Sequence, residues 1–216
     1  MTHRPSSAAE RLGPLHPLPG PFASPKIAVR FHLDNPFAAD LSALVAVFHD
    51  LVIEGLEGES LVDVITQVPG SRSLLLVATN AHYVLTDGPH ASLTRVQRRR
   101  WSAPVRLRLF ESIGRTLELV TRIGDDPRTP PSFTVRTDSF EVAVHDPLYA
   151  PNDRETFERG APIARNVLSE LYDEPIDVTP TGTVDAPFTL RIDAPERDVP
   201  WLRRRARALA PIRAIR

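Results

Sequence analysis

The chain has 216 residues, of which 42% are hydrophobic and 25% charged, the composition of an ordinary folded domain with a sizeable core. It contains no cysteine, which excludes disulfide frameworks, zinc ribbons, iron–sulfur ligation and thiol catalysis. The formal net charge of −1 conceals a segregation: residues 201–216 carry six arginines and no acid, whereas the other 200 residues hold 20 basic against 27 acidic side chains.

The first residues contain no continuous apolar region of the kind found in signal peptides. No apolar run approaches the roughly 18 residues that are needed to cross a bilayer. We therefore expect a soluble, cytoplasmic protein with no membrane span.

Residues 1–25 contain six prolines. Proline fixes φ and donates no backbone hydrogen bond, so this stretch cannot form a helix interior or a central strand. We expect a disordered arm, although Pro14 and Pro17 have the PxxP spacing that proline-binding modules read. After this arm we expect a single domain over 26–195 and an arginine-rich tail over 196–216.

The domain begins at 27–33 with alternating apolar and polar residues, the pattern of a half-buried strand. Apolar residues spaced three and four apart then predict a helix that follows Asp40 and ends near Gly55. Two strands are predicted at 61–68 and 73–85, and a third at 92–98.

A second helix is predicted over 102–124, with Pro104 in its first turn and Gly124 at its end. A third helix is predicted to start near Asn152 and to kink or restart at Pro162. Further short strands are predicted at 133–137, 140–145, 176–180 and 188–192.

The order of these elements predicts an α+β fold. Each helix is followed by strands close enough in sequence to form a hairpin, so the sheet should be largely antiparallel. We expect about three helices packed mainly on one face, in repeated α-β-β units.

The common catalytic and nucleotide-binding motifs are absent. The glycines form neither GxGxxG nor GxxxxGK[ST], and the chain has no GxSxG and no HExxH. The sequence therefore predicts no cofactor and no metal site.

One candidate site is a polar sheet face. Alternation places Arg30, His32 and Asp34 on one face of the first strand, and His82 and His145 on strands that could be its neighbours. If these side chains meet, they could form a general-base cluster or a small-ligand site.

Two arginine clusters, each beside a tryptophan, form the other candidate site, for an anion or a partner. They consist of Arg98, Arg99, Arg100 and Trp101, and of Trp201, Arg203, Arg204, Arg205 and Arg207. Such clusters can bind acidic partners or single-stranded nucleic acid. Alternatively, the first protects a strand edge, and the tail packs Trp201, Leu209 and Ile212 on its own acidic domain.

The stretch Arg136-Thr-Asp-Ser-Phe-Glu-Val-Ala-Val-His-Asp-Pro-Leu-Tyr-Ala-Pro-Asn-Asp-Arg-Glu-Thr-Phe157 resembles a motif, RTDxxExxVxDxLxAPNxxETF, of an uncharacterised bacterial protein family. The strand at 27–33, Val47-Phe48-His49 and Leu61-Val62-Asp63-Val64 also resemble family segments, and the resemblance covers about 27–180. Thr79 and Asn80 stand where the family has a histidine and a glutamate. The resemblance supports the fold and implies no function.

These observations favour a non-enzymatic protein-binding or assembly component whose termini act as docking arms. The arginine tail of one copy could reach the acidic body of another, which would give a homo-oligomer. The alternatives are an enzyme or small-ligand binder that uses the polar face, and a nucleic-acid binder that uses the arginine clusters; nucleic acid is the less favoured because the body is acidic.

Overall fold

The structure is a computed structural model that describes residues 20–23, 26–35, 41–66, 72–98 and 103–210. Its helices are η2 (Pro21–Ala23, a short 3-10 turn), α1 (Leu41–Glu54), α2 (Val105–Gly124), α3 (Arg154–Tyr172) and α4 (Val199–Leu209). Its strands are β1 (Ile27–Leu33), β2 (Leu61–Ile65), β3 (Ser73–Ala78), β4 (Ala81–Thr86), β5 (Ser92–Gln97), β6 (Val135–Val144), β7 (Asp177–Thr181) and β8 (Phe188–Asp193).

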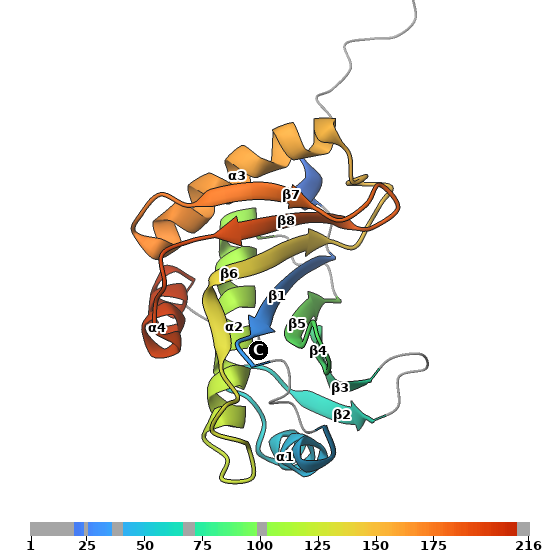
Figure 1. The fold of residues 1–216 in the computed structure, drawn as a ribbon, viewed down its shortest axis with the longest axis vertical. Coiled ribbons are helices and arrows are strands. Elements are labelled where there is room, and N and C mark those ends of the chain that lie inside the picture. The colour runs from blue at the N-terminus through green and yellow to red at the C-terminus, as the bar shows by residue number, and fades with distance from the viewer. Residues whose placement is uncertain (1–19, 24–25, 36–40, 67–71, 99–102, 211–216) are drawn as a thin grey trace, which may run out of the picture.

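The eight strands form one twisted sheet in the order β2-β3-β4-β5-β1-β6-β8-β7, and every neighbouring pair is antiparallel. The large apolar side chains buried on the central strands lie mainly on one face, against which α1, α2 and α3 pack, and α4 packs on α2 and α3 (Figure 1). This confirms the predicted α+β class and the antiparallel sheet. The described residues form four α-helices, because α4 forms where a tail was predicted.

Three predicted element boundaries were wrong. The segment 73–85 contains two strands, β3 and β4, which reverse at Thr79 and Asn80. The segments 133–137 and 140–145 belong to one strand, β6. Helix α3 runs through Pro162 without a restart, because its buried stripe continues on both sides of the proline and outweighs one lost backbone donor.

The helices are followed by unequal numbers of strands. Four strands follow α1, one follows α2 and the hairpin β7–β8 follows α3. The expected α-β-β unit therefore occurs as such after α3, whereas β2 to β5 form a meander of four neighbouring strands.

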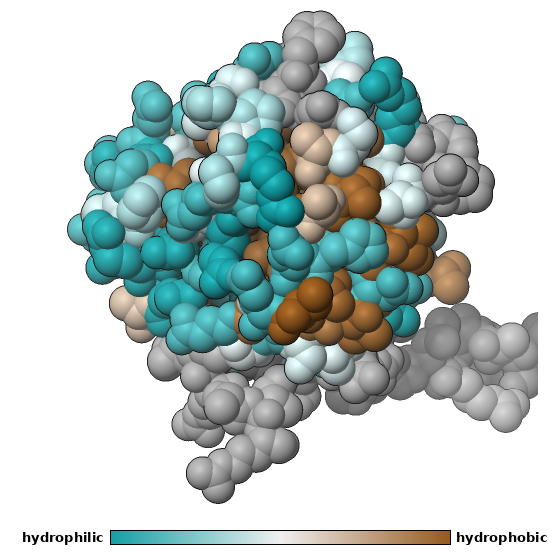
Figure 2. All heavy atoms as spheres, turned by 90° about the horizontal axis from the view of Figure 1, so that it is seen from below, coloured by the Kyte–Doolittle hydropathy of each residue, from teal (hydrophilic) through white to brown (hydrophobic). Residues whose placement is uncertain are grey.

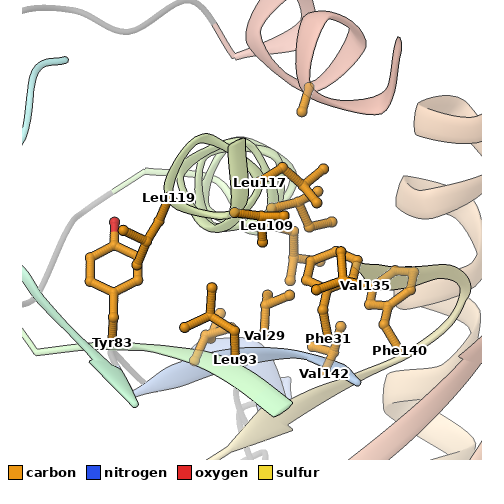
Figure 3. Packing of buried hydrophobic residues seen from close by; sticks show 14 of the residues in the cluster. Val29, Phe31, Tyr83, Leu93, Leu109, Leu117, Leu119, Val135, Phe140 and Val142 are labelled. Carbon is orange, nitrogen blue, oxygen red and sulfur yellow. The ribbon is translucent and has the colours of Figure 1, made fainter. Parts of the chain in front are cut away.

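Helix α2 is the longest element and lies across the middle of the sheet over β1 and β5 (Figure 3). Its buried residues Leu109 and Leu117 face Val29, Phe31 and Leu93 of these strands. This contact is the centre of one continuous hydrophobic core.

A charged cluster is buried beside this core. Arg95 of β5 is 2% exposed; its Nη2 lies 3.2 Å from Oε1 of Glu59, its Nε donates to the Tyr83 hydroxyl, and its Nη1 donates to Ser112 Oγ of α2. Tyr83 in turn donates to Glu59. Burial raises the pKa of Tyr83, with Arg95 opposing and Glu59 adding to the shift, so the phenol stays protonated and acts as a donor.

Two segments predicted to lie outside the domain are partly packed on it. Residues 20–23 of the predicted arm dock on α3: Phe22 is buried against Phe188, and Arg108 donates to the Phe22 carbonyl oxygen. A Cβ on Gly160 would lie 3.0 Å from atoms of Pro21 and Phe188, so the absence of a side chain there allows the close contact of these residues. Residues 1–19 lie outside the described residues.

The predicted C-terminal tail is mostly helix. Asp198 caps α4 by accepting from the Trp201 backbone N–H at 2.5 Å, and Leu202 and Ala206 are buried against the body. The Ala206 methyl lies close to Gly114 of α2, which lets the two helices approach. The prediction of a tail over 196–216 was therefore wrong for 199–209, because an apolar stripe at helical spacing outweighs the arginines around it.

We expect Arg95→Met to lower the free energy of unfolding by about 3–5 kcal/mol, because it leaves the Glu59 carboxylate buried without its cation. The measurement is urea unfolding at pH 7 followed by circular dichroism. Arg154→Met, which removes an exposed ion pair with Glu158, is the control and should cost less than about 0.5 kcal/mol. Equal losses in the two variants would contradict a structural role for the buried pair.

Candidate functional site

The face of the sheet opposite the helices is open, and one row of paired residues crosses all eight strands on it. From β2 to β7 the row is Ile65, Leu75, Val84, Thr94, Arg30, Glu141, Arg191 and Thr179. The first three are apolar and the last five polar. Along this row the apolar residues lie on β2 to β4 and the polar residues on β5, β1, β6, β8 and β7, and we call these two parts the apolar half and the polar half of the row.

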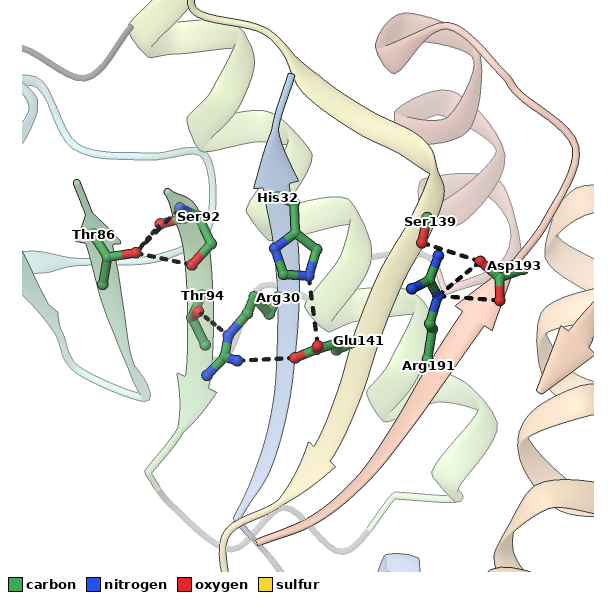
Figure 4. Close-up of polar contacts among 9 residues, drawn as sticks. All are labelled: Arg30, His32, Thr86, Ser92, Thr94, Ser139, Glu141, Arg191 and Asp193. Carbon is green, nitrogen blue, oxygen red and sulfur yellow. Dashed lines mark hydrogen bonds and ion pairs between the residues drawn. The ribbon is translucent and has the colours of Figure 1, made fainter. Parts of the chain in front are cut away.

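The centre of the polar half is Glu141 (Figure 4). Its Oε2 accepts from Arg30 Nη1 at 2.9 Å, and Arg30 Nε donates to Thr94 Oγ1 at 3.2 Å. His32 Nε2 lies 3.6 Å from Glu141 Oε1, which is too long for a hydrogen bond but close enough for ionic attraction. His32 and then Arg30 hold the pKa of Glu141 below its usual range, against the effect of burial. A carboxylate stabilised in this way is a weak proton acceptor.

The five residues of the predicted polar face do not form one cluster. Arg30 and His32 both lie against the Glu141 carboxylate, but Asp34 lies past the end of β1, in a groove described below. His82 lies on β4, two strands or about 10 Å from β1. His145 follows the end of β6. The general-base cluster predicted from these histidines is therefore wrong, because the meander places β5 between β4 and β1.

Burial lowers the pKa of both outlying histidines, so neither is held as a cation. For His82 the nearby Arg98 adds to the effect, and for His145 the charges of Arg30 and Lys26 do so. Sequence reasoning missed Glu141, although a glutamate on an alternating strand is a recognisable partner for an arginine on a neighbouring strand.

Further apolar side chains are exposed on β2 and on α1, which packs against β2 at the edge of the sheet. Val62 and Ile65 of β2 are 60% and 40% exposed, and Ile53 of the adjacent helix α1 is 84% exposed. Leu75 and Val84 lie partly buried beside them. Figure 2, which views this end of the molecule, shows hydrophobic side chains gathered over part of its surface. We call the surface formed by these five residues the apolar corner.

Sequence reasoning missed the apolar corner. The signal was present in Leu61-Val62-Asp63-Val64-Ile65, where apolar residues occupy both faces of one strand, because a strand of this kind is normally covered on both sides.

Both edges of the sheet are protected against the addition of another strand. On β2 the register shifts between Leu61 and Asp63, and the Asp63 carboxylate accepts from the Val64 backbone N–H at 2.8 Å. On β7, Pro180 has no backbone donor. A partner at the apolar corner therefore has to dock on side chains.

The arginines of α4 are largely paired within the chain. Arg203 and Arg207 lie 2.9 and 2.8 Å from the same Glu118 oxygen of α2, and Arg207 also lies 2.9 Å from Glu57. Arg205 donates to the Glu170 carbonyl oxygen.

Much of the second predicted arginine and tryptophan cluster is therefore engaged by other residues of the same chain. Arg204 is exposed, whereas Trp201 is partly buried with the Arg197 guanidinium 5.2 Å from its ring centre. The tail packs on its own acidic domain, as the alternative interpretation of these residues held, and Ile212 lies outside the described residues. Arg98 is exposed, while Arg99, Arg100 and Trp101 also lie outside them.

Within the described ranges, no three histidine, aspartate or glutamate side chains are grouped so that they could hold a metal ion. In the same ranges, none of the helices combines the length and the apolar character that crossing a bilayer requires.

No protein-family model matches the chain, and a search of curated proteins gives no match. The function therefore has to be inferred from the geometry of the surfaces.

We expect Glu141→Gln to lower stability in a pH-dependent way. The pKa of Glu141 is lowered in the folded state, so its carboxylate contributes stability above its unfolded value, near 4.3, and loses it as pH falls through the folded value. The difference in unfolding free energy between wild type and variant should be full above about pH 5 and shrink toward pH 3. Urea unfolding at several pH values measures it.

Thr179→Val is the control for this measurement, since it changes an uncharged residue of the same row. A difference for Glu141→Gln that stays constant from pH 7 to pH 3 would show that Arg30 and His32 do not stabilise the charged form.

Proposed function

We propose that the protein is a non-enzymatic protein-binding or assembly component that docks its partner on the apolar corner. The observation that carries this proposal is the exposure of Ile53, Val62 and Ile65 on two adjacent elements. Helix α1 and strand β2 pack on each other, so these three large aliphatic side chains lie on neighbouring elements. Exposed apolar side chains that gather on one part of a surface are characteristic of interaction surfaces.

The chemistry of the corner indicates how a partner binds. Its exposed side chains are aliphatic, and the carboxylate of Asp63 occupies the backbone edge beside them. Strand addition is disfavoured there, so the partner presents apolar side chains from a helix, a loop or a sheet face. The ion pair of Arg122 with Glu54, the residue next to Ile53, supplies polar groups at the side of the corner formed by α1.

The body, not a terminal arm, carries docking in this proposal. Helix α4 is part of the fold, so the predicted docking arm at 196–216 is reduced to residues 211–216. The partner at the apolar corner is a different protein, and the proposed location is the cytoplasm.

The two alternatives have less support. A small-ligand site would need a pocket around the histidines of the polar face, and five of the pockets formed by the described residues have linings that include none of His32, His82 and His145. Nucleic-acid binding would need unpaired arginines, and Arg203 and Arg207 are held by Glu118.

We expect the double variant Val62→Asp, Ile65→Asp to lose its protein partner while remaining folded. Both side chains are exposed, so stability should change by about 0.5 kcal/mol or less at each position. Two charges buried in an interface should weaken binding by at least tenfold. Quantitative co-purification after cross-linking in the native cell, compared between wild type and variant, measures this loss.

The matched control is Leu148→Asp, which places the same charge at a residue that is 96% exposed on the loop between β6 and α3. The control should retain every partner that the corner variant loses. Equal recovery of partners with both variants, or no partner with the wild type, would contradict the proposal.

A further inference from the structure

A groove separate from the apolar corner lies where the end of α2, the start of β6 and the start of α4 meet. Its volume is about 490 Å³, within the range of pockets that hold a small ligand or a short peptide segment. Two hydrogen bonds fix the segments beside the start of β6: the Asp34 N–H, just past β1, donates to the Thr134 carbonyl oxygen, and the Thr137 hydroxyl donates to the Arg197 carbonyl oxygen, just before α4.

The floor of the groove is apolar. Phe133, Val135 and Val120 contribute side chains that belong to the core, and Val199 and Pro200 from the first turn of α4 complete it. An aliphatic side chain that enters the groove therefore finds an apolar surface to bury.

The rim of the groove is acidic. It is lined by five carboxylates and two arginines. The carboxylates belong to Asp34, Asp125, Asp138, Glu196 and Asp198, and the arginines are Arg136 and Arg197. Both arginines are already engaged, Arg136 with Asp138 at 3.0 Å and Arg197 with Glu174 and the Trp201 ring. The C-terminal end of α2 adds a partial negative charge.

Three of the rim carboxylates remain available to a ligand. Asp34, Asp125 and Glu196 form no ion pair with another described residue. The groove is thus complementary to a segment that alternates aliphatic side chains, for the floor, with guanidinium groups, for the rim.

The chain itself contains a segment of this composition. Residues 211–216 have the sequence Pro-Ile-Arg-Ala-Ile-Arg, follow directly after α4 and lie outside the described residues. Two isoleucines alternate with two arginines, which matches the floor and the rim.

The position of α4 favours binding between two copies. Ala210, just past the end of α4, lies beside Gly114 of α2, whereas the groove lies beside Gly124 and the start of α4. An 11-residue helix is about 16 Å long, and six residues extend about 20 Å at most. Within one chain, the segment would have to reverse at once and use nearly its full length to reach the groove.

We propose that residues 211–216 of one copy bind in the acidic groove of a second copy. A reciprocal exchange gives a closed two-fold dimer, and a one-way exchange gives an open chain of copies. The inference concerns a surface distinct from the apolar corner, so its test does not depend on the proposed function.

The first experiment is light scattering of the full chain over a range of concentrations, compared with a chain that ends at Ala210 and keeps α4. The full chain should approach twice its monomer mass as concentration rises, and the shortened chain should stay monomeric. The double variant Arg213→Glu, Arg216→Glu should also be monomeric, whereas Arg204→Glu, on the exposed side of α4, should associate like the wild type. Association that persists in the shortened chain would overturn the proposal.

The second experiment uses a labelled synthetic peptide of residues 209–216 and the shortened chain. Fluorescence anisotropy should show binding that weakens with added salt, and that becomes at least tenfold weaker in the double variant Asp34→Asn, Asp125→Asn. Absence of peptide binding would overturn the proposal. Peptide binding combined with a full chain that is monomeric at every concentration would overturn it as well, because it would place the segment in the groove of its own chain.

Discussion

The structure depends on the burial of one face of the sheet under α2. Val29, Phe31 and Leu93 of the central strands pack against this helix, α1 and α3 pack on strands to either side of it, and α4 packs on α2 and α3. Because all helices lie on that side, the opposite face is left open, and its side chains are paired across strands. The same helix forms the support for α4 and, with its last turn, one wall of the acidic groove.

Arginine is used within this chain mainly to neutralise the chain's own carboxylates. Arg95 pairs with Glu59 in the core, Arg30 with Glu141 on the open face, and the arginines of α4 with Glu118. Two surfaces are not neutralised or covered in this way: the apolar corner, whose aliphatic side chains are exposed to water, and the acidic groove, three of whose carboxylates form no ion pair with a described residue. The two proposals concern these surfaces.

The segment that resembles the bacterial family motif has structural roles. Arg136 pairs with Asp138, and Glu141 holds Arg30. Asn152 donates to two carbonyl oxygens of the turn between β7 and β8, and the Asp153 carboxylate caps α3 by accepting from the Thr156 backbone N–H. The motif therefore fixes the junction between the central strand β6 and α3, which is consistent with a resemblance that implies a fold and no activity.

The α+β class, strand β1 and the amphipathic helices α1 and α2 could be predicted from the sequence, because period-2 and helical spacing of apolar residues are local properties. Which side chains contact one another depends on how distant segments pack. Glu118 and Arg203 are 85 residues apart, so nothing local could show that α4 packs on the body. The meander separates His82 from His32, and the bulge in β2 exposes Val62. The candidate sites therefore depend on the order of the strands and on how the helices pack, and neither can be predicted from one segment of the sequence.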